Sequence, residues 1–146
     1  MKEFIYEQNG EKALKVMYGE GIIDVEFYKE FTSSASKELF KKIKKDLNIE
    51  EVEINKLLFS KGVTFIGARS FSNNKIREVF FKGDIRYIGK NAFASCEIEK
   101  IHFNGNNKNQ LTIGENAFLN NKLKEVIIPK NTVQIEEGAF GFNQDL

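Results

Sequence analysis

The residues whose types could support nucleophilic or acid–base chemistry are one cysteine, Cys96, and one histidine, His102. Cys96 lies three positions after a recurring phenylalanine, where the other copies have asparagine, so it is interpreted as a small buried turn residue rather than a nucleophile. His102 falls at an outward position of a predicted strand, in a different part of the repeat from the turn that holds Cys96. The sequence has no glycine-rich phosphate loop and no histidine pair for a metal. We therefore expect no catalytic residue, no metal site and no cofactor, and a protein that is not an enzyme.

The recurring phenylalanine ends a motif that occurs four times: Ile-Gly, two further residues, a small residue and Phe, with Glu136 in place of the glycine in the fourth copy. The four copies end at Phe71, Phe93, Phe118 and Phe140, which are separated by 22, 25 and 22 positions. A fixed period of this length is typical of a stacked solenoid, in which each repeat packs on its neighbours. We expect the phenylalanines to form a continuous internal ladder. The glycine of the motif would allow a bend or a close approach between coils.

Short strands are predicted between these motifs, with apolar residues facing inward at the first, fourth and sixth positions. The matching segments are Ile49–Ile54, Ile76–Phe81, Ile98–Phe103 and Leu123–Ile128. Residues 49–54 are thus the expected first strand, and residues 49–146 a solenoid of about four coils. The last coil is expected to be incomplete, because the chain stops where the next strand should begin.

One position in the turns is shared by the repeats. It holds Asn74, Cys96, Asn121 and Asn143. An amide at this position can bond backbone groups of the neighbouring coil that would otherwise lack partners.

The pattern resembles the BspA-type, or Treponema-type, leucine-rich repeat, most clearly over Ile113–Pro129 and its weaker copies. The resemblance covers about residues 49–146. It implies an α/β fold: a leucine-rich-repeat solenoid with a parallel sheet on one face, usually found in surface adhesins and other protein-binding proteins. One strand ends in the family's Ile-Pro, at Ile128-Pro129, whereas the others have Phe-Lys or Phe-Asn there.

Residues 1–48 are predicted to form an N-terminal capping module of three strands and one helix. Asn9-Gly10 predicts a hairpin between strands near Lys2–Glu7 and Lys12–Tyr18. Ile23, Val25 and Phe27 alternate with acidic residues and predict a third strand. Thr32-Ser33-Ser34 would cap the following helix. Its apolar stripe is Leu39, Phe40, Ile43 and Leu47.

Binding is expected on the outward side of the strands. One outward column is apolar in part and contains Glu53, Phe80, His102 and Ile127. Two charged columns accompany it, Glu50/Arg77/Glu99/Lys124 and Glu51/Glu78/Lys100/Glu125. The first alternates in sign throughout and the second from Glu78 on, which fits cross-strand pairing that fixes the register. The candidate partner-binding residues are Phe80, His102, Ile127, Arg77, Lys100 and Lys124. The partner would be another protein, and self-association through the last coil is an alternative.

A second alternative is weak binding of an acidic ligand by Lys37, Lys41, Lys42, Lys44 and Lys45 on the exposed side of the helix. No aromatic residues interleave these lysines and the net charge of the chain is +1, so no nucleic-acid partner is expected. The sequence has no signal-peptide pattern at its start and no apolar run of the length that spans a bilayer. As written it predicts a cytoplasmic protein without membrane insertion, or a surface or secreted one if it belongs to a longer family member.

Overall fold

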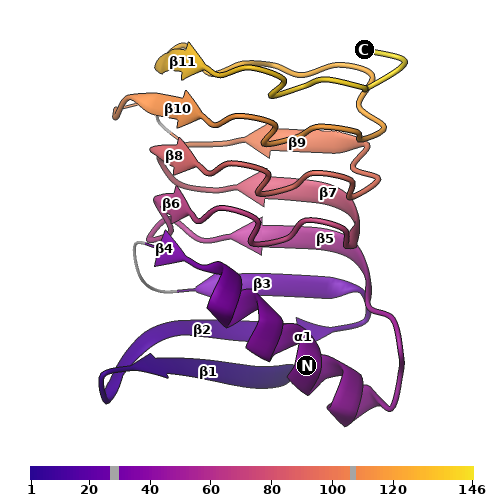
Figure 1. The fold of residues 1–146 in the computed structure, drawn as a ribbon. Helices are drawn as coiled ribbons and strands as arrows, with labels where there is room; N and C mark the ends of the chain where they lie inside the picture. The colour runs from indigo at the N-terminus through magenta and orange to yellow at the C-terminus, as the bar shows by residue number, and fades with distance from the viewer. Residues whose placement is uncertain (27–29, 106–107) are drawn as a thin grey trace.

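A computed structural model describes residues 1–26, 30–105 and 108–146 and shows one helix and eleven strands in that part of the chain (Figure 1). The strands of the larger sheet are β1 Lys2–Gln8, β2 Glu11–Gly19, β3 Ile22–Glu26, β5 Glu53–Phe59, β7 Lys75–Phe81 and β9 Lys100–Phe103. The strands of the smaller sheet are β4 Glu30–Phe31, β6 Phe65–Ile66, β8 Tyr87–Ile88, β10 Leu111–Ile113 and β11 Thr132–Ile135. Only β1–β2 and β2–β3 pair antiparallel, and every other described pair is parallel. The predicted solenoid with its N-terminal meander and helix is confirmed.

The N-terminal meander forms as the sequence predicts. Asn9 and Gly10 have φ values of 56° and 79°, the positive angles that a tight hairpin turn requires. Ile23 and Val25 are buried in β3, whereas Phe27, the third residue of the predicted alternation, lies outside the described residues. Because β3 pairs in parallel with β5, the meander continues directly into the sheet of the solenoid.

The helix α1, Ser33–Leu47, begins at the predicted cap: the Thr32 side chain accepts a hydrogen bond from the backbone N–H of Ala35 at 3.2 Å. Leu39, Phe40 and Ile43 are buried as predicted. Leu47 was predicted to be part of this buried stripe, and that prediction is wrong because its side chain is 45% exposed. It occupies the last turn of α1, where Asn48 ends the helix in a left-handed conformation and the chain leaves the core.

Strand β4 was not predicted, yet it explains where α1 sits. Phe31 pairs with Ile66 just as Ile66 pairs with Ile88, so Phe31 occupies the equivalent position one coil earlier. The backbone N–H of Gly67 donates to Phe31 at 2.7 Å, and that of Gly89 donates to Ile66 at 2.8 Å in the same way. In Figure 1, α1 leaves β4 as the turns leave β6 and β8, so the helix replaces the turn half of a coil.

The predicted first strand of the solenoid, residues 49–54, is wrong in register. In the structure β5 begins at Glu53, and Ile54, Leu57 and Phe59 lie opposite Ile76, Val79 and Phe81. Ile49 is 39% exposed and precedes the sheet. Both segments satisfy the same apolar spacing and share Ile54, which stands last in one and first in the other. The later segment is the one that forms the strand, because it pairs with β7 along the full length of β7.

The internal phenylalanine ladder is confirmed. Successive rings of Phe71, Phe93, Phe118 and Phe140 stack at 5.4, 5.2 and 5.6 Å between centroids, with planes within 3° of parallel. A second stack runs through the strands, with Phe59–Phe81 at 5.4 Å and Phe81–Phe103 at 5.2 Å. The coils approach closely at the motif glycines: a Cβ on Gly89 would lie 2.7 Å from the backbone nitrogen of Ala68.

The predicted strand at Leu123–Ile128 does not form in this structure. Leu123 is fully buried as expected, but Ile128 was predicted to face inward and is 36% exposed. Among the described strands, β9 is the last of the larger sheet, so this segment could pair with a strand on one side alone. Pro129, directly after the segment, has no backbone N–H to donate. The last coil therefore follows the path of the solenoid without a paired strand on this side.

Candidate functional site

The outer face is the side of β5, β7 and β9 that carries the residues between the buried ones. Register places Leu58, Phe80 and His102 opposite one another in one column. The predicted column had Glu53 at its first position. That assignment is wrong, because Glu53 lies opposite Lys75 at the start of the strands. We call Leu58, Phe80, His102 and Ile127 the apolar strip.

Phe80 and His102 are in direct ring contact within this strip. Their rings stack with centroids 4.2 Å apart and planes within 10° of parallel. The imidazole Nε2 of His102 lies 2.9 Å from Oε2 of Glu78, the residue diagonally across the strand pair. The imidazole is thus held over Phe80 by the sheet register and by a contact with one carboxylate.

Four of the six predicted binding residues line one hollow of about 1030 Å³ on the outer face. They are Lys100, His102, Lys124 and Ile127. Ile127 is 80% exposed, so its side chain is offered to a partner rather than to the core. Phe80 borders the hollow through its contact with His102. The lining also includes Gln144 and Asp145 from the C-terminal segment, whose presence there the sequence pattern did not indicate. Its remaining residues are Glu99, Ile101, Lys122 and Glu125.

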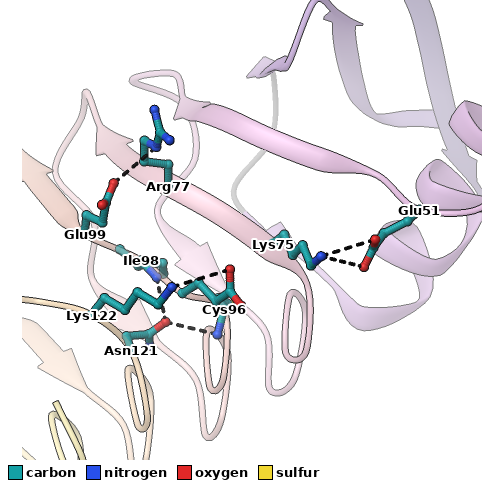
Figure 2. Close-up of polar contacts among 9 residues, drawn as sticks. Glu51, Lys75, Arg77, Cys96, Ile98, Glu99, Asn121 and Lys122 are labelled. Atoms are coloured by element: carbon teal, nitrogen blue, oxygen red, sulfur yellow. Dashed lines mark hydrogen bonds and ion pairs between the residues drawn. The ribbon is translucent and has the colours of Figure 1, made fainter. Parts of the chain in front are cut away.

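Arg77, the sixth predicted residue, lies in an adjoining polar hollow of about 220 Å³, which shares Glu99 and Lys122 with the first. Its Nε is 3.1 Å from Oε2 of Glu99 on the next coil. Lys75 pairs with Glu51 at 3.2 Å, as Figure 2 shows. Lys122 pairs with Glu97 at 3.9 Å. The charged side chains on this part of the surface therefore form ion pairs between neighbouring coils.

The charged columns also change with the corrected register. Glu50 and Glu51 precede β5 and belong to neither column. Lys56 instead lies opposite Glu78, which lies opposite Lys100. This column alternates in sign along its whole described length, a pattern that favours one register of the strands.

The asparagine position contains a network rather than reactive groups. Asn121 Oδ1 accepts from the backbone N–H groups of Cys96 and Ile98, each at 3.0 Å, and these bonds are drawn in Figure 2. Its Nδ2 donates to the carbonyls of Phe93 and Phe118, each at 2.9 Å. The predicted role of this position in pairing neighbouring coils is confirmed here. Asn143 repeats it one coil later, where its Oδ1 accepts from Leu123 at 3.1 Å.

Cys96 is fully buried within this network, and its thiol donates to the carbonyl of Phe71 at 3.0 Å. Burial raises the pKa of the Cys96 thiol to about 12. A thiol with such a pKa carries almost no thiolate at neutral pH, so it is a poor nucleophile.

Within the described part of the chain, no group of three or more histidine, cysteine or acidic side chains is placed to hold a metal ion. Among the same residues, no helix has the length and apolarity to cross a membrane.

Parallel strands stacked coil on coil, with repeated internal ladders and one exposed sheet face, define a solenoid repeat protein. The sequence model for the BspA type leucine rich repeat region matches residues 41–146 in 6 copies. The chain belongs to this family. The match begins within α1, upstream of the first predicted strand.

A solved structure has a similar fold: the crystal structure of a leucine-rich repeat protein from Eubacterium ventriosum ATCC 27560 at 2.50 Å resolution. It aligns with a TM-score of 0.65 at 18% sequence identity, over 100% of this chain and 43% of that one. The chain thus spans less than half of that protein, and at this identity the likeness concerns the fold. Comparison with curated protein sequences found no match.

Proposed function

We propose that the chain is a non-enzymatic protein-interaction module that binds another protein through the outer face. The observation that carries the proposal is the apolar strip, which runs across neighbouring strands beside the hollow of about 1030 Å³. A contiguous apolar strip bordered by polar residues is the composition of a protein interface centre with its rim. Leucine-rich-repeat families are generally protein-binding, and that background supports the proposal.

Each binding residue has a defined role in this proposal. Phe80 and Ile127 supply apolar contact area, and His102 supplies a flat ring with a polar edge. Lys100 and Lys124 line the hollow, and these cations would steer an acidic rim of the partner. Arg77 is already paired with Glu99 on the next coil, so its contribution would be smaller. The resemblance to surface proteins extends the proposal to adhesion at a bacterial cell surface.

The experiment begins with a photoreactive phenylalanine analogue placed at position 80, and separately at Lys90 on the opposite half of the coil. The expected result is a cross-linked protein from the position-80 variant alone. That protein is purified and its affinity is measured for Phe80→Asp, for Ile127→Asp and for Val133→Asp, an exposed apolar residue of β11. Each outer-face substitution should cost about 2 kcal/mol of binding, while Val133→Asp should change little. Equal affinities for all three variants would contradict the proposal.

Self-association is a second candidate function, favoured by one specific observation. Of the ten large hydrophobic residues exposed in the described chain, six fall in the last coil. They are Ile127, Ile128, Val133, Ile135, Phe142 and Leu146. A second copy could cover them by packing against this coil. Light scattering over a hundredfold concentration range tests this, because a mass that stays monomeric throughout rules it out.

A further inference from the structure

A basic groove lies between α1 and the first turn of the solenoid. Its volume is about 390 Å³. Lys37, Lys41 and Lys44 line it from the helix, and Arg69 lines it from the turn that follows β6. The sequence pattern indicated the lysines, but Arg69 is 25 residues beyond Lys44 and is brought opposite them by the fold.

The helical contribution is a single stripe. Ser33, Lys37, Lys41 and Lys44 are spaced by four, four and three residues, which places them on one side of a helix. From Lys37 to Lys44 the stripe extends about 10 Å along the axis at 1.5 Å per residue. The groove therefore presents a row of positive charge rather than a single point.

The charges in this groove are uncompensated, in contrast to those of the outer face. None of the described residues lining it is acidic, and the described ion pairs include none of its four cations. Lys42, on another side of α1, pairs with Asp46 at 3.3 Å. The first turn of α1 also has no acidic residue, so the positive end of the helix dipole adds to the field at the Lys37 end.

We propose that this groove binds an acidic glycan, a sugar chain that carries sulfate or carboxylate groups. The four cations of the groove can pair with the negatively charged sulfate or carboxylate groups of such a chain. The Ser33 hydroxyl and the side-chain oxygens of Ser72 and Asn74 lie in the same lining, where they can bond sugar hydroxyls. The Asn74 amide nitrogen is already bonded to carbonyls of its own turn. Phe40 is the one aromatic residue of the lining and is 8% exposed. The groove thus lacks the stacking platform of a single-stranded nucleic-acid site and the exposed apolar centre of a protein interface.

This site is separate from the proposed protein-binding surface. The groove is lined by α1 and the turn after β6, while the outer face belongs to β5, β7 and β9. The lining of the groove and that of the hollow on the outer face share no residue, so substitutions in one are expected to leave the other intact and the two proposals can fail independently.

The test uses the full chain and a heparin oligosaccharide of defined length, with binding measured by calorimetry at several salt concentrations. The double variant Lys41→Gln/Lys44→Gln removes two groove charges. The matched control Lys42→Gln/Lys45→Gln removes the same charge from the rest of the same helix. The groove variant should bind roughly tenfold more weakly and roughly halve the slope of log K against log salt, because it loses two of four cations. Arg69→Gln should also weaken binding, because it removes a charge from the side of the groove opposite α1.

Two outcomes would overturn the proposal. Equal weakening by the two double variants would mean that only the overall charge of the chain matters. An oligothymidylate of matched charge that binds as tightly as heparin, and loses affinity in the groove variant alone, would show that the groove accepts any polyanion rather than glycans. Circular dichroism of each variant confirms that the fold is retained, and binding of the Phe80→Asp variant should equal that of the unmodified chain.

Discussion

Asn121 lies one coil beyond Cys96, and its side-chain oxygen accepts the backbone N–H of Cys96 at 3.0 Å. The thiol of Cys96 in turn donates to Phe71 on the preceding coil at 3.0 Å. The position thus passes hydrogen bonds from coil to coil, whether an amide or a thiol occupies it. These bonds satisfy backbone groups that the turn conformation leaves without partners, and they tie consecutive coils together.

Asn121→Ala should lower the free energy of unfolding by about 3 kcal/mol, because several buried backbone groups lose a partner at once. The matched control is Asn74→Ala at the equivalent position of an earlier coil. Within the described part of the chain, the Asn74 side chain bonds carbonyls of its own turn, Phe71 at 2.9 Å and Ser72 at 3.4 Å, so its loss should be about 1 kcal/mol. Urea denaturation of the three proteins measures both values, and equal losses would contradict the inter-coil role of Asn121.

The Cys96 thiol should make stability fall at alkaline pH. Its folded-state pKa of about 12 lies above the ordinary value of 9.0. The unfolded chain therefore loses this proton first, so the contribution is complete below pH 9 and disappears as pH rises from 9 toward 12. At pH 10.5 the loss should be about 2 kcal/mol relative to pH 8.

Cys96→Ala provides the control for this effect. Tyr18, buried and bonded to Asp46, also has a pKa raised to about 12 and also destabilises the fold at high pH, but it is present in both proteins. The unmodified chain should therefore lose more stability between pH 8 and 10.5 than the variant does. Parallel pH profiles would show that the thiol makes no such contribution.

Much of the fold could be predicted because the repeated motif is local and unambiguous. The phenylalanine ladder, the asparagine position and the Asn9-Gly10 hairpin depend on residue types with narrow preferences. The first strand was misplaced because the apolar spacing fits residues 49–54 and Ile54–Phe59 equally well. The period separates them: Ile54, Ile76 and Ile98 are 22 residues apart, as two of the three motif spacings are.

The residues of the candidate site could be predicted only as accurately as the register of the first strand of the solenoid. Leu58 was missed from the apolar strip because shifting the first strand moved Glu53 into its place. Arg69 and the hollow beside Gln144 depend on how distant segments pack, which spacing along the chain does not encode. Strand β4 is two residues long, too short to produce a periodic signal.

Gly89→Ala should destabilise the protein by roughly 1–3 kcal/mol, since the added methyl group has no room. It would lie 2.7 Å from the Ala68 nitrogen and 2.9 Å from the Ile66 oxygen, both backbone atoms held by parallel pairing. Gly67→Ala is the control, because its nearest contact, the Phe31 oxygen, is at 3.2 Å. Thermal unfolding should rank the variants in that order, and a Gly67→Ala variant less stable than Gly89→Ala would contradict this account of coil spacing.

The corrected register predicts an energetic coupling between Lys56 and Glu78. These residues lie opposite each other on β5 and β7, so a double-mutant cycle with Lys56→Ala and Glu78→Ala should give a favourable interaction of about 0.2–1 kcal/mol. The register with residues 49–54 as the strand would instead place Glu51 opposite Glu78, and Lys56 would be uncoupled from it. Asn55 with Glu78 forms the control cycle, because Asn55 carries no charge and is not the partner of Glu78. Since exposed charge pairs are screened by salt, the Lys56–Glu78 coupling should shrink at 1 M sodium chloride. A coupling of zero at low salt would contradict the register on which the apolar strip depends.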